Sequence, residues 1–362
     1  MLGCLTERLQ DVSKDATLTC FGQEFNPETY AIAKADMLIK GGNASGMKYG
    51  DTLSDDAFGG YEFDYVISNP PFGIDWKREK SQVESEAKRG YDGRFGPGLP
   101  AISDGQMLFM LNGVKKLKEG SGRMAIIQNG SSLFTGDAGS GASEIRRYLI
   151  HEDLVEAIVQ LPTDLFYNTG ISTYIWVLTK GKPMSRSGRV QLIDASKCFV
   201  KRRKNIGSKR VDLDDACIDL ILKAYEGFDQ NEVYTADDLV VESKVFENDF
   251  FGFTKVTVET AQTDANGKLL LKKGKKLPVK GATDSEIIPL SDDIDAYMAK
   301  NVLPYNPLAY IDPAKDKIGY EIPFTRLFYK FEAPEPSASI FEDIKALEAK
   351  ETVLMKELFG NA

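Results

Sequence analysis

The run Asn69-Pro70-Pro71-Phe72 combines side chains that can recognise a flat, polar ring. The Asn69 amide offers a donor and an acceptor, and Phe72 offers an aromatic face for stacking on a nucleobase. Pro70 and Pro71 fix φ and lack a backbone N–H, so they hold the adjacent carbonyl groups rigidly. Two acceptors on one exocyclic amine concentrate electron density on its nitrogen, and its attack on an electrophile then needs no general base. The same run is equally typical of a turn after a strand, so its surroundings must decide.

The chain around this run alternates short apolar strands with polar strand ends. Tyr65, Val66 and Ile67 read as a buried parallel strand, because β-branched and aromatic residues run directly into the prolines. Asn26 and Pro27 are typical of a helix start. Further strands are expected at 18–24, 47–49 and 124–128, each followed by polar residues. This alternation predicts a doubly wound α/β fold.

Six motifs follow one another along the chain. They are Phe21-Gly22-Gln23-Glu24-Phe25-Asn26-Pro27, Tyr30-Ala31-Ile32-Ala33-Lys34, Gly50-Asp51-Thr52-Leu53, Asn69-Pro70-Pro71-Phe72, Asp104-Gly105-Gln106 and Gly122-Arg123-Met124-Ala125. Together they resemble the modification subunit of type I restriction-modification systems, a family of N6-adenine DNA methyltransferases. The resemblance implies a Rossmann-like α/β methyltransferase fold with a C-terminal α+β or helical extension. It also implies methyl transfer from S-adenosylmethionine to adenine N6 in DNA.

The resemblance assigns roles to the residues at the strand ends. Asn69, Pro70, Pro71 and Phe72 would be catalytic and hold a flipped base. The cofactor would be bound by Glu24, Phe25, Asp51, Thr52, Leu53 and Asn69. A carboxylate at the end of a second strand, as Glu24 is here, suits the ribose hydroxyls, although an exposed strand-end acid is an equal alternative. Asp51 is expected to hold the adenine amino group of the cofactor.

The chain departs from the family pattern at its start. The family carries a glycine-rich Asp-Pro-x-x-Gly-Thr-Gly loop after the first strand, and this sequence contains no such run. The helical domain that precedes the loop in the family is absent as well. The sequence is therefore expected to be an N-terminally truncated or split modification subunit with an open cofactor pocket. It should bind S-adenosylmethionine weakly or not at all by itself.

Two rival functions remain open. The same loop chemistry serves methylation of cytosine N4 or of a protein glutamine amide, and identifying the methylated product separates these from adenine N6. A non-catalytic scaffold that only binds its partner subunit is favoured by the absent loop. Complex formation without methyl transfer would identify it.

DNA contacts are expected on three segments. Residues 74–105 read as a long loop that orders on DNA, with Lys77, Arg78 and Arg94 on phosphates. Trp76, Tyr91 and Phe95 are candidate stacking residues in the same loop. Phe166 is a second candidate for stacking on the target base, with core packing as its alternative. Arg202 and Arg203 lie in the basic segment 197–210, which fits either phosphates or a solvated face, whereas the six lysines of 268–280 are typical of a mobile hairpin.

The composition bounds the partners and the compartment. The net charge is −9 over 362 residues, which is unusual for a protein that grips double-stranded DNA alone. The family resemblance implies partner subunits that would contribute to DNA binding and function: a specificity subunit, a second modification subunit and a restriction subunit. Four scattered cysteines and one histidine make a metal site improbable. The sequence contains no apolar run of membrane-spanning length and does not begin as a signal peptide, so a cytoplasmic protein without a membrane partner is expected.

Three regions are expected along the chain. Residues 1–210 would form the catalytic domain without its first strand and loop, and 211–333 an extension. Residues 334–362 would form a C-terminal helix with one apolar face. Following the resemblance, this helix is expected to dock on the specificity subunit, with packing on the chain's own core as the alternative. The apolar face comprises Ile340, Ile344, Leu347, Leu354 and Leu358.

Overall fold

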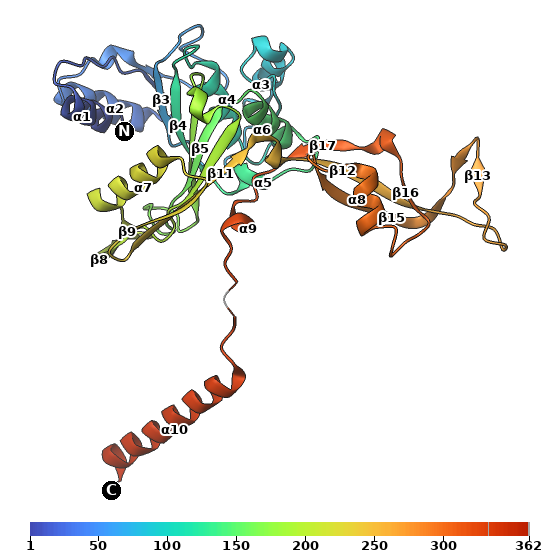
Figure 1. The fold of residues 1–362 in the computed structure, drawn as a ribbon. Helices are drawn as coiled ribbons and strands as arrows, with labels where there is room; N and C mark the ends of the chain where they lie inside the picture. The colour runs from blue at the N-terminus through green and yellow to red at the C-terminus, as the bar shows by residue number, and fades with distance from the viewer. Residues whose placement is uncertain (332, 361–362) are drawn as a thin grey trace. The chain divides into compact units, whose positions relative to one another are not determined.

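A seven-stranded mixed sheet forms the centre of the computed structural model, which describes residues 1–331 and 333–360. Its strand order is β10-β11-β7-β5-β6-β4-β3 (Figure 1). The strands are β3 (Tyr65–Ser68), β4 (Arg123–Asn129), β5 (Val155–Gln160), β6 (Thr173–Thr179), β7 (Arg189–Asp194), β10 (Asn231–Ala236) and β11 (Leu239–Glu247). β3 is parallel to β4 and β5 is parallel to β7, while β6 runs antiparallel between β4 and β5. The carboxyl ends of β3, β4, β5 and β7 therefore share one edge of the sheet.

The first two strands of the chain lie outside this sheet. β1 (Gly22–Glu24) and β2 (Met47–Tyr49) form a parallel pair of their own. The helix between them is α2 (Pro27–Ile39), and the predicted cap is confirmed, because the Asn26 side chain accepts from the N–H groups of Glu28 and Thr29. α1 (Leu2–Val12) precedes the pair. The strand expected at 18–24 is shorter than predicted, since only its last three residues pair with β2.

Helices pack against the middle strands of the central sheet and against its edge formed by β7, β11 and β10. They are α4 (Gln106–Lys115), α5 (Ser131–Phe134), α6 (Gly141–His151) and α7 (Asp215–Gly227). α4 buries seven of its ten residues, and β4 buries alternate residues. On the far end, Cys217 and Leu220 of α7 pack with Ile193 of β7 and Val241 of β11. The boundary expected at residue 210 thus does not divide the fold, because β10, β11 and α7 complete the same sheet and its core.

A second, smaller sheet follows in the chain. It is built from β12 (Gly252–Ala261), β15 (Pro278–Pro289), β16 (Ala309–Ile311) and β17 (Lys317–Tyr320), with β12 pairing to the other three. Val256, Ile288 and Met298 form its core together with α8 (Ile294–Asn301). Two hairpins extend from the two sheets. They are β8 (Val200–Ile206) with β9 (Lys209–Asp212), and β13 (Leu271–Lys272) with β14 (Lys275–Lys276).

Arg146 joins the two sheets. Its fully buried guanidinium donates from Nε to the Tyr320 carbonyl of β17 at 2.6 Å and from Nη1 and Nη2 to the carbonyls of Ser132 and Thr135 at 3.2 and 3.0 Å. Burial lowers the pKa of Arg146 to about 10. The guanidinium stays charged at neutral pH and satisfies three carbonyl groups from distant parts of the chain.

Replacing Arg146 with methionine is expected to lower the free energy of unfolding by about 3 kcal/mol, because three buried carbonyl groups lose their donors. Urea unfolding followed by circular dichroism measures the change. Arg147→Met is the matched control, since the neighbouring Arg147 is exposed and pairs with the solvent-accessible Glu144 at 3.3 Å. Equal stability of the two variants would contradict the role of Arg146.

The chain divides after Pro323, and the second unit begins at Phe324. It contains α9 (Phe324–Phe328), the helix α10 (Ser337–Phe359) and no strand within its described residues. α10 has no buried residue, and its apolar side chains, among them Ile340, Ile344 and Leu347, are exposed. Neither α10 nor any other helix in the described part of the chain has the length and apolar character that crossing a bilayer requires.

Candidate functional site

The predicted site residues gather at the carboxyl ends of three strands. Glu24 ends β1 and pairs in register with Tyr49 at the end of β2, and the Gly50 N–H donates to the Glu24 carbonyl at 3.1 Å. Asp51 follows directly. Asn69 follows β3 in the same way. Parallel strands thus bring side chains that are far apart in the sequence to one edge.

A cavity of about 1080 Å³ joins these strand ends. Its wall includes all five residues predicted to hold only the cofactor, and Asn69, Pro70 and Pro71 of the predicted catalytic run. The cofactor residues are Glu24, Phe25, Asp51, Thr52 and Leu53. Residues of β1 and of β3 both line it, and among the described residues neither strand pairs with another strand on the side that faces the cavity. The cavity therefore occupies the space between two unpaired strand edges.

Glu24 and Asp51 are held in place by backbone groups. One Glu24 oxygen accepts from the Asn26 N–H at 2.8 Å, and its second oxygen has no partner within residues 1–331 and 333–360. Asp51 accepts from the Leu53 N–H at 3.0 Å and from the Ser54 hydroxyl at 2.8 Å. These bonds orient both carboxylates and leave acceptor capacity for a ligand.

Glu79 is a cavity residue that the sequence did not single out. Burial raises the pKa of its carboxyl, and the negative charge and hydrogen bond of Asp51 raise it further. The Glu79 carboxyl and the Asp51 carboxylate therefore lie against one another in the wall of the cavity. Glu79 comes from a segment without a recognisable period, so only the tertiary fold could reveal it.

Asn69 is exposed at the end of β3, and its side-chain amide has no hydrogen-bond partner in the described part of the chain. Pro70 is buried behind it. A primary amide whose donor and acceptor are both unused, fixed by a strand on one side and by prolines on the other, is ready to bind a polar ligand. Phe72 is partly buried and does not line the cavity.

The Asp104-Gly105-Gln106 motif braces the neighbouring strand end. The Gln106 side-chain amide donates to Asp104 at 2.7 Å, to Asn129 at 2.8 Å and to the Ser131 hydroxyl at 2.6 Å. Its oxygen accepts from the Asn129 N–H at 3.0 Å. Gly105 in turn donates its N–H to the Ile74 carbonyl at 3.0 Å. The motif thus fixes the loop after β4 and the loop after Asn69 relative to each other.

The expectation for Arg94 requires correction. Arg94 is only 8% exposed and does not face a DNA surface. Its guanidinium binds both oxygens of Glu86 at 2.8 and 2.6 Å, the carbonyls of Thr52 and Leu53 at 2.6 and 3.1 Å, and Asn112 at 3.1 Å. All of its donor groups are therefore used inside the fold. Arg94 positions the loop that carries Asp51 instead of binding phosphate.

The segment 74–105 is also not the loop that was expected. It contains the helix α3 (Lys80–Ala87), and Trp76 and Phe95 are 3% and 0% exposed. The Trp76 indole donates to the Ala101 carbonyl at 3.1 Å. These two aromatic side chains are core residues and are not free to stack on bases, whereas Tyr91 is exposed. The sequence of this segment shows no regular spacing of apolar residues, because its buried side chains belong to several short elements.

The remaining predicted DNA residues occupy separate places. Arg78 lines the cavity, and Lys77 is exposed, 3.7 Å from Asp75. Phe166 is partly buried in the loop after β5. The hairpin β8–β9 lies beside this loop, because its Ser208 and Arg210 N–H groups donate to the carbonyls of Tyr167 and Asp164, both at 2.8 Å. Arg202 of this hairpin pairs with Asp212, and Arg203 is exposed.

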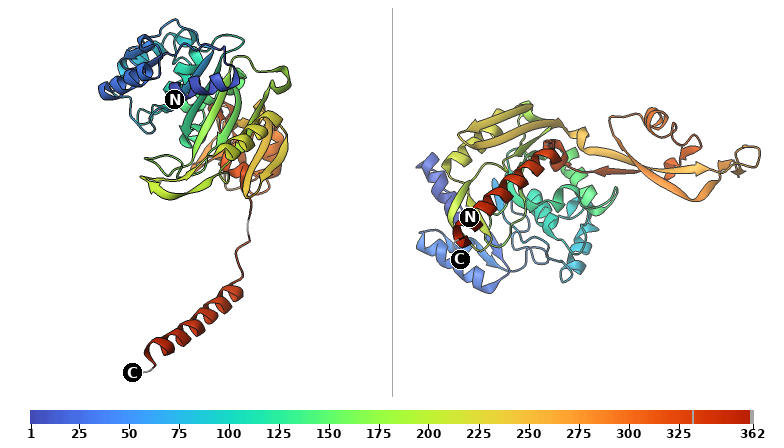
Figure 2. Two further views of the ribbon diagram at one scale, coloured as in Figure 1. Left: turned by 90° about the vertical axis from the view of Figure 1, so that its left-hand side faces the viewer. Right: turned by 90° about the horizontal axis from the view of Figure 1, so that it is seen from below.

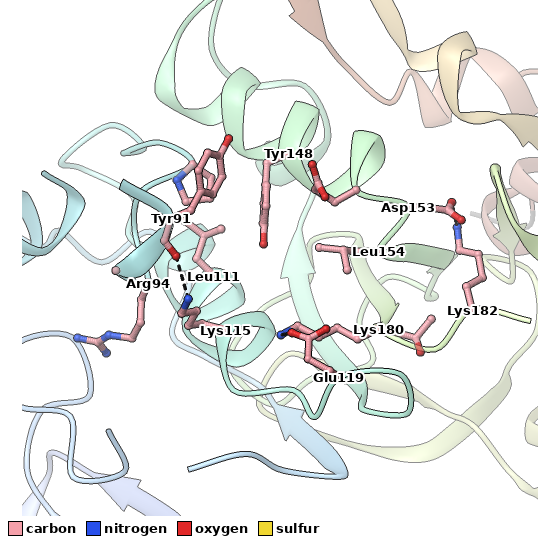
Figure 3. A pocket seen from close by; sticks show the side chains of 14 residues that line it. Tyr91, Arg94, Leu111, Lys115, Glu119, Tyr148, Asp153, Leu154, Lys180 and Lys182 are labelled. Atoms are coloured by element: carbon pink, nitrogen blue, oxygen red, sulfur yellow. Dashed lines mark hydrogen bonds and ion pairs between the residues drawn. The ribbon is translucent and has the colours of Figure 1, made fainter. Parts of the chain in front are cut away.

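A second pocket, of about 420 Å³, lies at the opposite end of the central sheet (Figure 3). Leu154 and Thr179 place it at the start of β5 and the end of β6. Its lysines already have partners: Lys115 donates to the Tyr91 carbonyl at 2.8 Å, Lys180 pairs with Glu119 and Lys182 with Asp153. Of the predicted site residues, Arg94 and the candidate stacking residue Tyr91 line it, and none of the predicted catalytic or cofactor residues does. The candidate site is therefore the larger cavity.

Comparisons with known proteins identify a family that matches most of the chain. The family described as N-6 DNA Methylase matches residues 1–266. The type I restriction enzyme MjaIX methylase subunit of Methanocaldococcus jannaschii is 29% identical over 191 residues, which make up 52% of this chain and 33% of that protein. The HindI methylase subunit of Haemophilus influenzae is 27% identical over 290 residues, 79% of this chain and 61% of that protein.

A solved structure shares the arrangement of strands and helices. The crystal structure of the type I restriction-modification system methyltransferase subunit from Streptococcus thermophilus aligns with a TM-score of 0.56 and 27% identity. The alignment covers 69% of this chain and 49% of that one. The chain thus spans between 33% and 61% of the length of these three relatives.

Proposed function

Because the chain belongs to the N-6 DNA methylase family, we propose that it forms the catalytic part of a type I modification subunit, which methylates adenine N6 in DNA with S-adenosylmethionine. The family and the α/β methyltransferase fold that the sequence predicted are both confirmed. One observation carries the proposal. The unpartnered Asn69 amide lies at the end of β3 in the same cavity as Glu24 and Asp51.

The base would be held by the catalytic run. The Asn69 side-chain oxygen accepts one hydrogen of the adenine amino group, and the rigid Pro70 carbonyl accepts the other. The nitrogen lone pair stays directed at the methyl group, and no metal or covalent enzyme intermediate is required. Phe72 stacks on the flipped ring in this scheme, which requires its side chain to turn toward the cavity. These residue roles remain predictions.

The hydrogen-bond acceptors and the apolar surface of the cavity fit the cofactor. Glu24 has an unused carboxylate oxygen for ribose hydroxyls, and Asp51 retains lone pairs for an adenine amino group. Phe25, Thr52 and Leu53 supply apolar and backbone surface. S-adenosylmethionine, when bound, supplies an electrophilic methyl group to the amine.

Calorimetric titration of S-adenosylmethionine into this chain is expected to show weak binding, with a dissociation constant of about 1 mM or higher. The cavity lies between the edges of β1 and β3, and this sequence contains no Asp-Pro-x-x-Gly-Thr-Gly loop to approach the charged methionine part of the cofactor there. A version lengthened upstream by a strand and an Asp-Pro-x-x-Gly-Thr-Gly loop should bind at least about tenfold more tightly.

Glu24→Gln in the lengthened version is the control, because it replaces one acceptor oxygen with an NH2 donor and removes the negative charge without changing the size of the side chain. It should weaken binding again. Micromolar binding by the unextended 362-residue chain would refute the expectation. Absence of binding by both versions would count against the methyltransferase proposal.

The non-catalytic scaffold is the second candidate, and the open cavity is the observation that favours it. Assembly with a specificity subunit without methyl transfer to DNA would establish it. Methylated cytosine N4 or a methylated glutamine amide as the product would identify the sister chemistries.

The partners follow from the relatives and from α10. We infer that the chain acts on double-stranded DNA in the cytoplasm, together with a specificity subunit, a second modification subunit and a restriction subunit. The exposed apolar side chains of α10 are the proposed contact with the specificity subunit, because an amphipathic helix without buried residues requires a partner surface.

A further inference from the structure

Positive charge is concentrated in residues 268–280, the tip of the segment that contains β13 and β14. Residues 268–280 contain six lysines and no acidic residue, so they carry a formal charge of +6. Since the whole chain has a net charge of −9, the rest of it carries −15. The lysines are Lys268, Lys272, Lys273, Lys275, Lys276 and Lys280. Such segregation differs from the mixed charges of an ordinary solvated surface.

These lysines are not used by the fold. All six are exposed, and none of them forms an ion pair within residues 1–331 and 333–360. Lys276 lies 5.1 Å from the centre of the Tyr310 ring, which leaves its charge uncompensated. The nearby acid Glu259 is already taken by Lys315 and the Tyr310 hydroxyl. The positive charge of the tip is therefore available to a partner.

The backbone of the tip forms the hairpin that its composition suggested, and hydrogen bonds join its two sides. The Gln262 N–H donates to the Leu277 carbonyl at 2.7 Å. The Leu270 N–H donates to the Gln262 carbonyl and the Leu277 N–H to the Leu270 carbonyl, both at 2.9 Å. Lys273 and Gly274 turn the chain with φ of 52° and 81°, as a tight two-residue hairpin requires. Two views show the tip at the outer end of the β12–β15 ladder (Figures 1 and 2). The lysines are thus presented on an ordered support.

We propose that this lysine-rich tip, residues 268–280, binds the phosphate backbone of duplex DNA away from the base held at Asn69. The proposal rests on DNA as the substrate and adds a second contact. The ten residues of β12 extend about 30 Å at the rise of a strand, which approaches one helical turn of B-DNA. The family model matches residues 1–266, and the tip follows directly after that match.

The test uses the full chain, a fluorescent duplex of about 40 base pairs, and salt titration of the affinity. Exchange of Lys272, Lys273, Lys275 and Lys276 for glutamine should weaken binding at least about tenfold near 0.1 M salt. It should also reduce the slope of log K against log salt by up to about 3.6, since each of the four lost phosphate contacts contributes about 0.9. A quadruple control exchanges Lys14, Lys223, Lys300 and Lys350, which are exposed and have no ion pair among the described residues.

Equal slopes for the two quadruple variants, or no binding by the parent chain at about 50 mM salt, would overturn the proposal. Thermal unfolding of each variant confirms that the exchange leaves the fold intact. Methyl transfer is measured separately with the complete complex. A smaller salt dependence in the lysine-tip variant, with no methyl transfer by the parent complex, supports DNA binding by the lysine-rich tip and refutes the proposed function. Methyl transfer by the parent complex, with the same salt dependence for the parent chain and the lysine-tip variant, refutes only DNA binding by the lysine-rich tip.

Discussion

Replacing Asn69 with alanine is expected to lower methyl transfer to DNA by about 10²- to 10³-fold in the chain assembled with its specificity subunit. The amide is the side-chain acceptor that would hold the target amine, and removal of one such preorganised group typically has an effect of this size. Incorporation of a labelled methyl group into duplex DNA measures the rate. Cofactor affinity should fall much less than the rate, because Asn69 is one of six predicted cofactor residues, and Glu24 and Asp51 stay in place at the ends of their own strands.

Two further variants separate the chemistry from structure. Asn69→Asp keeps an oxygen acceptor and should retain more activity than the alanine variant. Asn231→Ala removes an exposed asparagine at the start of β10, on the far edge of the sheet, and should leave the rate unchanged. Unchanged turnover of Asn69→Ala would sink the assignment of the catalytic run.

Replacing Arg94 with methionine is expected to lower the free energy of unfolding by about 3–5 kcal/mol. The exchange leaves Glu86 partly buried without its cation, and it removes the donors of the Thr52 and Leu53 carbonyls. The loop that carries Asp51 would lose its anchor, so cofactor affinity should fall in the same variant. Urea unfolding and calorimetric titration measure the two effects.

Arg89→Met is the matched control for Arg94, since Arg89 is an exposed arginine five residues earlier in the chain. The double variant Arg94→Met/Glu86→Leu should recover part of the lost stability, because it removes the unpaired carboxylate. If Arg94 bound phosphate instead, its exchange would weaken DNA binding and leave stability unaltered.

The pair also predicts a pH dependence. Burial alone would raise the pKa of Glu86, but hydrogen bonds from the Arg94 side chain and N–H lower it below its ordinary value. The ionised pair therefore stabilises the fold above about pH 4.3, the ordinary pKa of glutamate, and this contribution is lost as the pH falls through the lowered pKa. In Arg94→Met the acid-side loss should shrink, because protonation then relieves an unpaired charge.

The site edge was predictable from local sequence. The strands before Asn69 and Asp51 are short apolar runs that end in prolines or glycine, and such residues terminate a strand wherever it lies. Asn26 and Pro27 mark the start of α2 for an equally local reason, which the structure confirms. The parallel pairing of β1 with β2 brings Glu24 and Asp51 to one edge, whereas Asn69 joins them only through the cavity between β1 and β3.

The roles of charged side chains were decided by the tertiary structure. Arg94 and Arg78 look alike in the sequence, yet Arg94 meets Glu86, Thr52 and Leu53 inside the fold whereas Arg78 lines the cavity. The association of β10 and β11 with β7, and the paired backbone of the lysine-rich tip, also depend on contacts between distant segments. The sequence by itself determined where strands end and which polar groups follow them, because these are local properties of the backbone. Burial and pairing of charges were decided only by the fold, because they depend on which distant groups it brings together.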